Sequence, residues 1–125
     1  MKFQPDSLAG VNAITRHEPG RLWVGAQPFE GSLVVPWQGP PRAWRPRQLQ
    51  DLSAEDFAQV LACAPELVIL GTGPRLAFPA AAVLRPLIEL GKGVESMDTA
   101  AAVRTYNVLA SEGRRVVGAF IVAAN

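Results

Sequence analysis

The sequence has few of the residues from which catalytic and metal sites are commonly built. It contains one cysteine, Cys63, and one histidine, His17, so it offers neither an intrachain disulfide nor one of the usual zinc ligand sets. A lone cysteine also fits a reducing compartment. A Gly-x-Ser-x-Gly nucleophile elbow, a Walker A sequence and the third glycine of the dinucleotide fingerprint are absent as well. We therefore expect no bound metal and no cofactor, and a non-catalytic role is favoured over an enzymatic one.

Charge and long hydrophobic runs are equally scarce. Charged residues make up 18% of the chain and the formal net charge is +1, which argues against a nucleic-acid-binding protein. No apolar run reaches the roughly 20 residues of a membrane-spanning helix, and the first residues lack the apolar stretch of a signal peptide. Apolar residues still account for 49% of the 125 residues, enough for one core. We expect a single domain over residues 1–125, with residues 1–9 as a flexible tail, located in the cytoplasm.

The order of the predicted elements indicates an α/β fold. Two strands joined by a tight turn are expected between residues 11 and 25, and two short strands between residues 32 and 45. From residue 52 onward helix and strand patterns alternate, with helices at 53–64, 79–90 and 99–112 and strands at 67–70, 94–97 and 116–122. Such alternation predicts parallel strands with right-handed crossovers. We therefore expect a compact three-layer domain whose mixed central sheet has a parallel β-α-β-α-β part and antiparallel N-terminal hairpins.

Polar residues follow two of the predicted parallel strands. Gly71-Thr72-Gly73 comes after the first strand, and Asp98-Thr99 comes after the second. Because the carboxyl ends of parallel strands meet at one edge of a sheet, the two segments are expected to share a crevice. Backbone N–H groups of glycine and a nearby guanidinium would suit an anion. The candidate ligand-binding residues are Gly71, Thr72, Gly73, Asp98, Thr99, Arg104 and Asn107.

A structural role is the simpler explanation for several of these residues. Asp98 suits the N-cap position of the following helix, a role worth about 1 kcal/mol, and the glycines suit a tight turn with positive φ. Tyr106 falls on the apolar stripe of the same helix. A salt bridge would account for Arg104, and a backbone hydrogen bond would account for Asn107.

A second group of candidates lies between residues 32 and 50, a segment without an acidic residue. It combines tryptophan with arginine, and arginine suits protein interfaces. A surface that binds a protein partner is the functional interpretation, and a solvated loop is the structural one. The candidate partner-binding residues are Trp37, Arg42, Trp44, Arg45 and Arg47.

Several motifs make the chain resemble a known family. They are Gly71-Thr72-Gly73, the run Val-Glu-Ser-Met-Asp-Thr at 94–99, the run Arg-Thr-Tyr-Asn-Val-Leu at 104–109, and Glu112-Gly113-Arg114. The chain resembles a widespread domain of unknown function whose mitochondrial members act as assembly factor 3 of respiratory complex I (NADH:ubiquinone oxidoreductase). The resemblance covers roughly residues 10–123 and implies a compact three-layer α/β fold with no established enzymatic activity. Without a mitochondrial leader in the sequence, a bacterial cytoplasmic member is the expected assignment.

One position departs from the family pattern. Many bacterial members place a cysteine just before the arginine of the Arg-Thr-Tyr-Asn motif, whereas this chain has Val103 there, so thiol chemistry at that position is excluded. The prediction is a non-catalytic, assembly-factor-like module that binds other proteins and is linked to respiratory complex assembly. The alternative is a binder of a small anionic ligand, or an enzyme, that uses the crevice between Gly71, Asp98 and Arg104. The sequence leaves the oligomeric state open.

Overall fold

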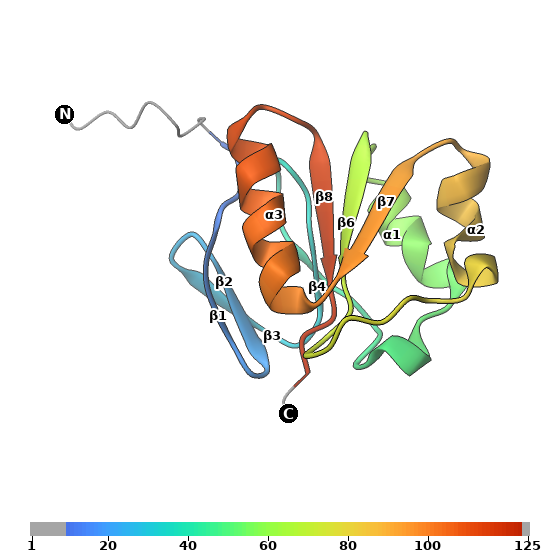
Figure 1. The fold of residues 1–125 in the computed structure, drawn as a ribbon. Coiled ribbons are helices and arrows are strands. Elements are labelled where there is room, and N and C mark those ends of the chain that lie inside the picture. The colour runs from blue at the N-terminus through green and yellow to red at the C-terminus, as the bar shows by residue number, and fades with distance from the viewer. Residues whose placement is uncertain (1–9, 124–125) are drawn as a thin grey trace.

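The computed structural model describes residues 10–123 (Figure 1). The predicted flexible tail, residues 1–9, lies outside the described residues. In chain order the elements are β1 (Ile14–Glu18), β2 (Arg21–Val24), β3 (Gln27–Glu30), β4 (Leu33–Val35), β5 (Arg42–Ala43), the short 3-10 helices η1 (Leu49–Asp51) and η2 (Ala54–Phe57), α1 (Ala58–Leu61), β6 (Leu67–Gly71), α2 (Ala81–Glu89), β7 (Gly93–Met97), α3 (Thr99–Ser111) and β8 (Val116–Phe120).

The strands form two sheets. A three-stranded antiparallel sheet has the order β1-β2-β3, and a five-stranded mixed sheet has the order β5-β4-β8-β6-β7. Strand β6 pairs in parallel with both β7 and β8, whereas β4 pairs antiparallel with β5 and β8. The predicted α/β class, with a parallel C-terminal part and antiparallel N-terminal strands, is confirmed.

Alternate residues of the central strands point into two separate cores. In β6, Ile69 packs on the side of α3, whereas Val68 and Leu70 pack on the side of α1 and α2. Strand β8 alternates in the same way, because successive side chains of a strand point to opposite faces of the sheet. Helices therefore cover both faces of the five-stranded sheet, with α3 on one face and α1 and α2 on the other (Figure 1).

The structure differs from the sequence expectation in three places. Strand β3 was missed because Pro28 weakens the strand signal, and β3 lies at the edge of its sheet, where proline is tolerated. The helix expected at 53–64 is a 3-10 turn followed by the four residues of α1. Strand β7 begins one residue before the expected start, at Gly93, and it is an edge strand whose side chains are exposed or half-buried.

The core on the side of α3 is organised around Tyr106. Its ring meets Phe120 edge-on, with centroids 6.0 Å apart. The Tyr106 hydroxyl lies 3.0 Å from the carbonyl oxygen of Asn12 and 3.1 Å from that of Pro36. Burial raises the pKa of this hydroxyl. The prediction that Tyr106 is a core residue with a hydrogen-bonded hydroxyl is confirmed.

Candidate functional site

The expected crevice lies at the carboxyl ends of β6 and β7. The crossover from β6 to β7 runs through α2, and the crossover from β7 to β8 runs through α3 on the opposite face of the sheet (Figure 1). In open α/β sheets, loops that leave neighbouring strands toward opposite faces leave a crevice between them. Here the last pair of β6 and β7 is Gly71 and Met97, so the glycine segment and Asp98-Thr99 lie side by side.

Thr99 fills much of the space between the two loops. Its hydroxyl accepts a hydrogen bond from the Gly73 N–H (2.9 Å) and donates one to the carbonyl oxygen of Ile121 (2.7 Å). The Thr99 N–H in turn donates to the Gly73 carbonyl oxygen at 2.8 Å. Only 2% of the residue is exposed. The Gly73 N–H, which the anion-binding interpretation requires, is therefore already used within the protein.

The two glycines have steric reasons to be glycine. A Cβ on Gly71 would stand 2.9 Å from the Thr99 hydroxyl and 3.1 Å from the Thr99 Cα. Gly73 has φ +105°, a conformation that residues with a side chain rarely adopt. Thr72 is equally occupied, because its hydroxyl donates to the Arg75 carbonyl oxygen at 2.6 Å. The glycine segment is thus explained by close packing and by a tight turn.

Asp98 caps α3 as expected, since its Oδ1 accepts a hydrogen bond from the Ala101 N–H at 2.9 Å. Asn107, two turns further along the helix, holds β1 against α3. Its Nδ2 donates to the Ile14 carbonyl oxygen (2.8 Å) and its Oδ1 accepts from the Ile14 N–H (2.9 Å). The backbone hydrogen bond considered for Asn107 is therefore present, and it uses both ends of the side-chain amide.

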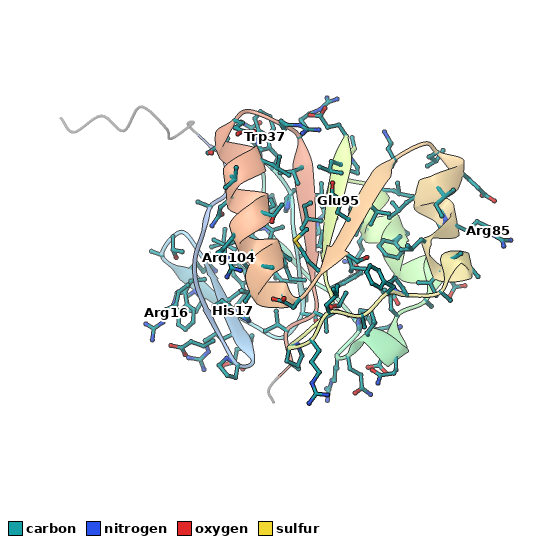
Figure 2. The ribbon with its side chains drawn as sticks, viewed as in Figure 1. Arg16, His17, Trp37, Arg85, Glu95 and Arg104 are labelled. Atoms are coloured by element: carbon teal, nitrogen blue, oxygen red, sulfur yellow. The ribbon has the colours of Figure 1, made fainter. Side chains whose placement is uncertain are left out.

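Arg104 differs from its neighbours on α3. Its side chain is exposed, and within residues 10–123 it makes no hydrogen bond or ion pair, so the salt bridge considered for it is not formed. Figure 2 shows Arg104 on the outer side of α3. It does not line the cavity at this end of the sheet. The structure thus separates Arg104 from the glycine segment with which it was grouped.

A cavity of about 310 Å³ remains beside the crevice, and its lining includes the two acidic residues Glu18 and Asp98. It is lined by Gly73, Asp98 and Thr99 and by His17 and Glu18 at the β1–β2 turn. Burial lowers the pKa of His17, and the Asp98 carboxylate opposes that shift. Neither arginine nor lysine is among the residues that line the cavity. Two carboxylates make it unfavourable for the anion that the sequence suggested.

Two of the predicted partner-binding residues, Trp44 and Arg45, make their contacts within the protein. Trp44 is only 4% exposed, meets Phe57 edge-on and donates its indole N–H to the Asp56 carbonyl oxygen at 2.9 Å. It belongs to the core, which corrects its assignment to a binding surface. Arg45 forms a two-pronged ion pair with Asp56, with nitrogen–oxygen distances of 2.9 and 2.7 Å. The Arg45 guanidinium lowers the pKa of Asp56.

The other three candidates lie at the surface. Arg42 and Arg47 are exposed, and neither side chain has a partner in the described part of the chain. Trp37 is half-buried, and its indole N–H donates to the Ala110 carbonyl oxygen at 3.3 Å. Trp37 and Arg42 line a cavity of about 330 Å³ together with Cys63 and Arg115. Cys63 and Arg115 were not expected at this surface, because they lie far from Trp37 and Arg42 in the chain.

A further concave region lies beside the loop between β6 and α2. Leu76 and Phe78 on this loop are 54% and 74% exposed, and they line a cavity of about 670 Å³. Their exposure gave no signal in the sequence, since short apolar runs also occur in cores. Across residues 10–123, His, Cys, Asp and Glu side chains do not gather into a group that could hold a metal. Nor does any helix in this range have the length and apolar character needed to cross a membrane.

Known proteins with similar sequences and structures give the family. A crystal structure of a Bordetella parapertussis protein matches with a TM-score of 0.84 and 36% identity, covering 91% of this chain and 98% of that one. The Francisella tularensis "13 kDa major membrane protein" is 31% identical over 68 residues, which are 54% of this chain and 55% of that protein. Bovine NADH dehydrogenase (ubiquinone) 1 alpha subcomplex assembly factor 3 is 37% identical over 81 residues, which are 63% of this chain and 44% of that protein. The chain thus spans about half the length of these two relatives. Residues 14–121 match the model of the family described as "Protein of unknown function (DUF498/DUF598)", and the chain belongs to that family.

Proposed function

We propose that this protein is a protein-interaction module that assists the assembly of a respiratory complex. The observation that carries the proposal is its similarity to assembly factor 3 of NADH dehydrogenase, at 37% identity over 81 residues in the bovine protein and 35% in the human one. The matched stretch covers 63% of this chain. An assembly factor works by contacting the subunits of its target, so the proposal requires an exposed binding surface.

The loop between β6 and α2 offers such a surface. Leu76 and Phe78 project apolar side chains into solvent beside a concave region of about 670 Å³. Exposed apolar groups at a concave site are typical of protein–protein contacts. Thr72 anchors the start of the loop through its hydrogen bond to the Arg75 carbonyl. Arg47 is a candidate at the rim, because the adjacent Gln48 lines the same cavity. We assign the partner contact to Leu76 and Phe78, the apolar loop.

Affinity capture with the tagged full chain from a native lysate tests this proposal. We expect respiratory complex subunits among the captured proteins, and Phe78→Asp should strongly reduce their recovery because it places a charge in the apolar contact. Val108→Asp is the matched control, since Val108 is 55% exposed on α3. Consistent failure of the unmodified chain to recover respiratory subunits would refute the assembly role. Equal recovery by Phe78→Asp would refute the assignment of the contact to the apolar loop.

The place in the cell is a separate prediction. The single cysteine fits the reducing cytoplasm, whereas the Francisella relative is named a major membrane protein. An assembly module could act at a membrane surface from the cytoplasmic side. We expect the protein in the cytoplasmic fraction after lysis, with any membrane-bound portion released by high salt, and recovery only after detergent extraction would contradict this.

A further inference from the structure

A second charged cavity lies at the opposite end of the five-stranded sheet from the β6–β7 crevice. It has a volume of about 330 Å³ and brings together Trp37, Arg42, Cys63 and Arg115. Arg115 directly precedes β8, which runs parallel to β6, so this cavity lies near the end where β6 and β8 begin. Figure 2 shows Trp37 at this end of the molecule and His17 at the other. We call this cavity the basic pocket.

The strand register places Arg42 on the α1 side of the sheet, level with Ala119 of β8. Arg42 in β5 is paired with Val34 of β4, and Val34 packs into the core on the side of α1. Side chains of directly paired residues share a face of the sheet, so Arg42 lies on the α1 side. Along β8, Val117 packs on that side as well. Arg115 lies in the turn just before β8, and it lines the same cavity as Arg42.

The charges of the basic pocket are not neutralised within the described chain. Neither the Arg42 nor the Arg115 side chain makes an ion pair or hydrogen bond there, and no carboxylate is among the lining residues. The Glu66 carboxylate contacts the backbone of Arg115 instead, because it accepts a hydrogen bond from the Arg115 N–H at 2.9 Å. Two guanidinium groups free to form paired hydrogen bonds suit the oxygens of phosphate or carboxylate.

The remaining lining residues add an apolar wall and a reporter group. Pro36, Pro40 and Ala62 supply the apolar part of the lining, whereas the Trp37 indole packs against the core on the side of α3 and donates to the Ala110 carbonyl. Burial raises the pKa of the Cys63 thiol, and the positive charge of Arg42 partly opposes that rise. The field of Arg42 therefore reaches the interior wall of the pocket. A ligand with an anionic group and a planar or apolar part would match both kinds of wall.

We propose that the basic pocket binds a small anionic ligand, whose phosphate or carboxylate group contacts Arg42 and Arg115 and whose planar or apolar part packs against the apolar lining of the pocket. The site is independent of the protein contact assigned to the apolar loop. Its free guanidinium groups supply what the acidic cavity at the β6–β7 crevice lacks.

Calorimetric titration of the full chain at low salt, followed by backbone NMR, tests the proposal. The probes are inorganic phosphate, AMP, adenosine and glycerol 3-phosphate, the last of which represents a lipid headgroup. We expect the phosphate-bearing probes to bind and to shift the amide signals of residues 37, 42 and 115, with adenosine far weaker. Tighter binding of AMP would indicate a nucleotide-like ligand, and tighter binding of glycerol 3-phosphate would indicate a headgroup; both support an anion site.

Variants separate this site from general surface charge. Arg42→Ala and Arg115→Ala should each weaken binding of the preferred probe by about tenfold or more, as expected for loss of a charged hydrogen-bonding partner. Arg85→Ala is the matched control, because Arg85 is an exposed arginine on α2 (Figure 2). This variant should bind the probe with unchanged affinity. Arg42→Lys keeps the positive charge but loses the paired hydrogen bonds of the guanidinium, so its affinity for the probe should fall by less than that of Arg42→Ala. If Arg42→Ala unfolds, Arg42→Lys still tests the role of Arg42.

Three results would overturn the proposal. They are failure of every phosphate-bearing probe to bind at millimolar concentration, equal affinity of adenosine and AMP, and unchanged affinity in both alanine variants. Loss of binding in Arg104→Ala but not in Arg42→Ala would also overturn it, because the anion would then lie beside α3. Thermal melts of each variant must match the unmodified chain, so that a loss of binding reports the site.

Discussion

The two ends of the five-stranded sheet differ in what their polar groups do. At the end where β6 and β7 finish, Thr99 joins two loops through buried hydrogen bonds, and the neighbouring cavity carries the carboxylates of Glu18 and Asp98. At the other end, Arg42 and Arg115 share a cavity and have no partners within the described chain. The polar groups of the glycine and Asp98-Thr99 segments are thus mostly hydrogen-bonded within the protein. The side chains that remain free to bind a ligand, Arg42 and Arg115, belong to no recognisable motif.

The difference between the two ends of the sheet has a physical cause. Loops that follow neighbouring parallel strands leave backbone groups unpaired, and burying them without partners is costly. This chain satisfies them with the Thr99 hydroxyl and with backbone hydrogen bonds between the loops, so little remains for a ligand. Exposed guanidinium groups need no hydrogen-bond partner within the protein, because water solvates them. They remain available to bind an anion.

Among the predicted substitutions, the largest loss of stability is expected at Gly71. A Cβ there would press on the backbone of Thr99 and on the Phe120 ring, 3.1 and 3.2 Å away, so Gly71→Ala should lower the free energy of unfolding by about 3 kcal/mol. Gly93→Ala is the control at the start of β7, since its Cβ would meet only the end of the Leu67 side chain at 3.1 Å. Urea denaturation measures both. Equal losses of unfolding free energy in the two variants would show that Gly71 is packed no more closely than Gly93.

The next largest effect is expected at Thr99. Replacing it by valine keeps the shape but leaves the Gly73 N–H and the Ile121 carbonyl without their buried partner, which should cost about 2 kcal/mol. Thr105→Val on the same helix is the control, since the Thr105 hydroxyl makes no hydrogen bond in the described residues. A loss below that of the control would contradict the bridging role.

A smaller effect is expected at the basic end. Arg42 opposes the rise that burial causes in the pKa of Cys63, so Arg42→Ala should raise this pKa further and slow alkylation of the thiol by iodoacetamide near neutral pH a few-fold. Because the chain has one cysteine, the reaction reports this site alone. Arg85→Ala should leave the rate unchanged. An unchanged rate in Arg42→Ala would place its guanidinium away from the pocket.

The smallest effect is expected at the acidic end. Asp98 opposes the lowering of the His17 pKa by burial, so Asp98→Asn should lower that pKa further while asparagine keeps the helix cap. A folded pKa below the unfolded value of about 6.5 means that the unfolded state binds the proton more readily. Stability is therefore lost as pH falls from that value through the folded pKa, and Asp98→Asn should enlarge the loss. NMR titration of the single histidine measures the shift, with Glu95→Gln as the control; a rise in Asp98→Asn would contradict the assignment.

Local signals account for the correct parts of the sequence analysis. The positions of β6, β7, β8 and α3 follow from apolar runs and helical periodicity, and the capping role of Asp98 depends on a group only three residues away. Trp44 was misassigned because a tryptophan beside arginines has the same local pattern whether it is exposed or buried. Its burial follows from contact with Phe57, which lies in another element.

The sequence by itself determined the α/β order of the elements, the helix cap and the presence of an edge rich in glycine and polar groups, because these depend on neighbours within a few positions. Only the tertiary structure decided what those groups do. Asn107 binds the backbone of Ile14, 93 positions away, and Thr99 binds the Ile121 carbonyl, 22 positions away. The presence of Arg42 and Arg115 in the lining of one cavity likewise depends on the folding together of segments that are far apart in the chain. Such contacts arise from strand register and packing between distant segments, which no local pattern encodes.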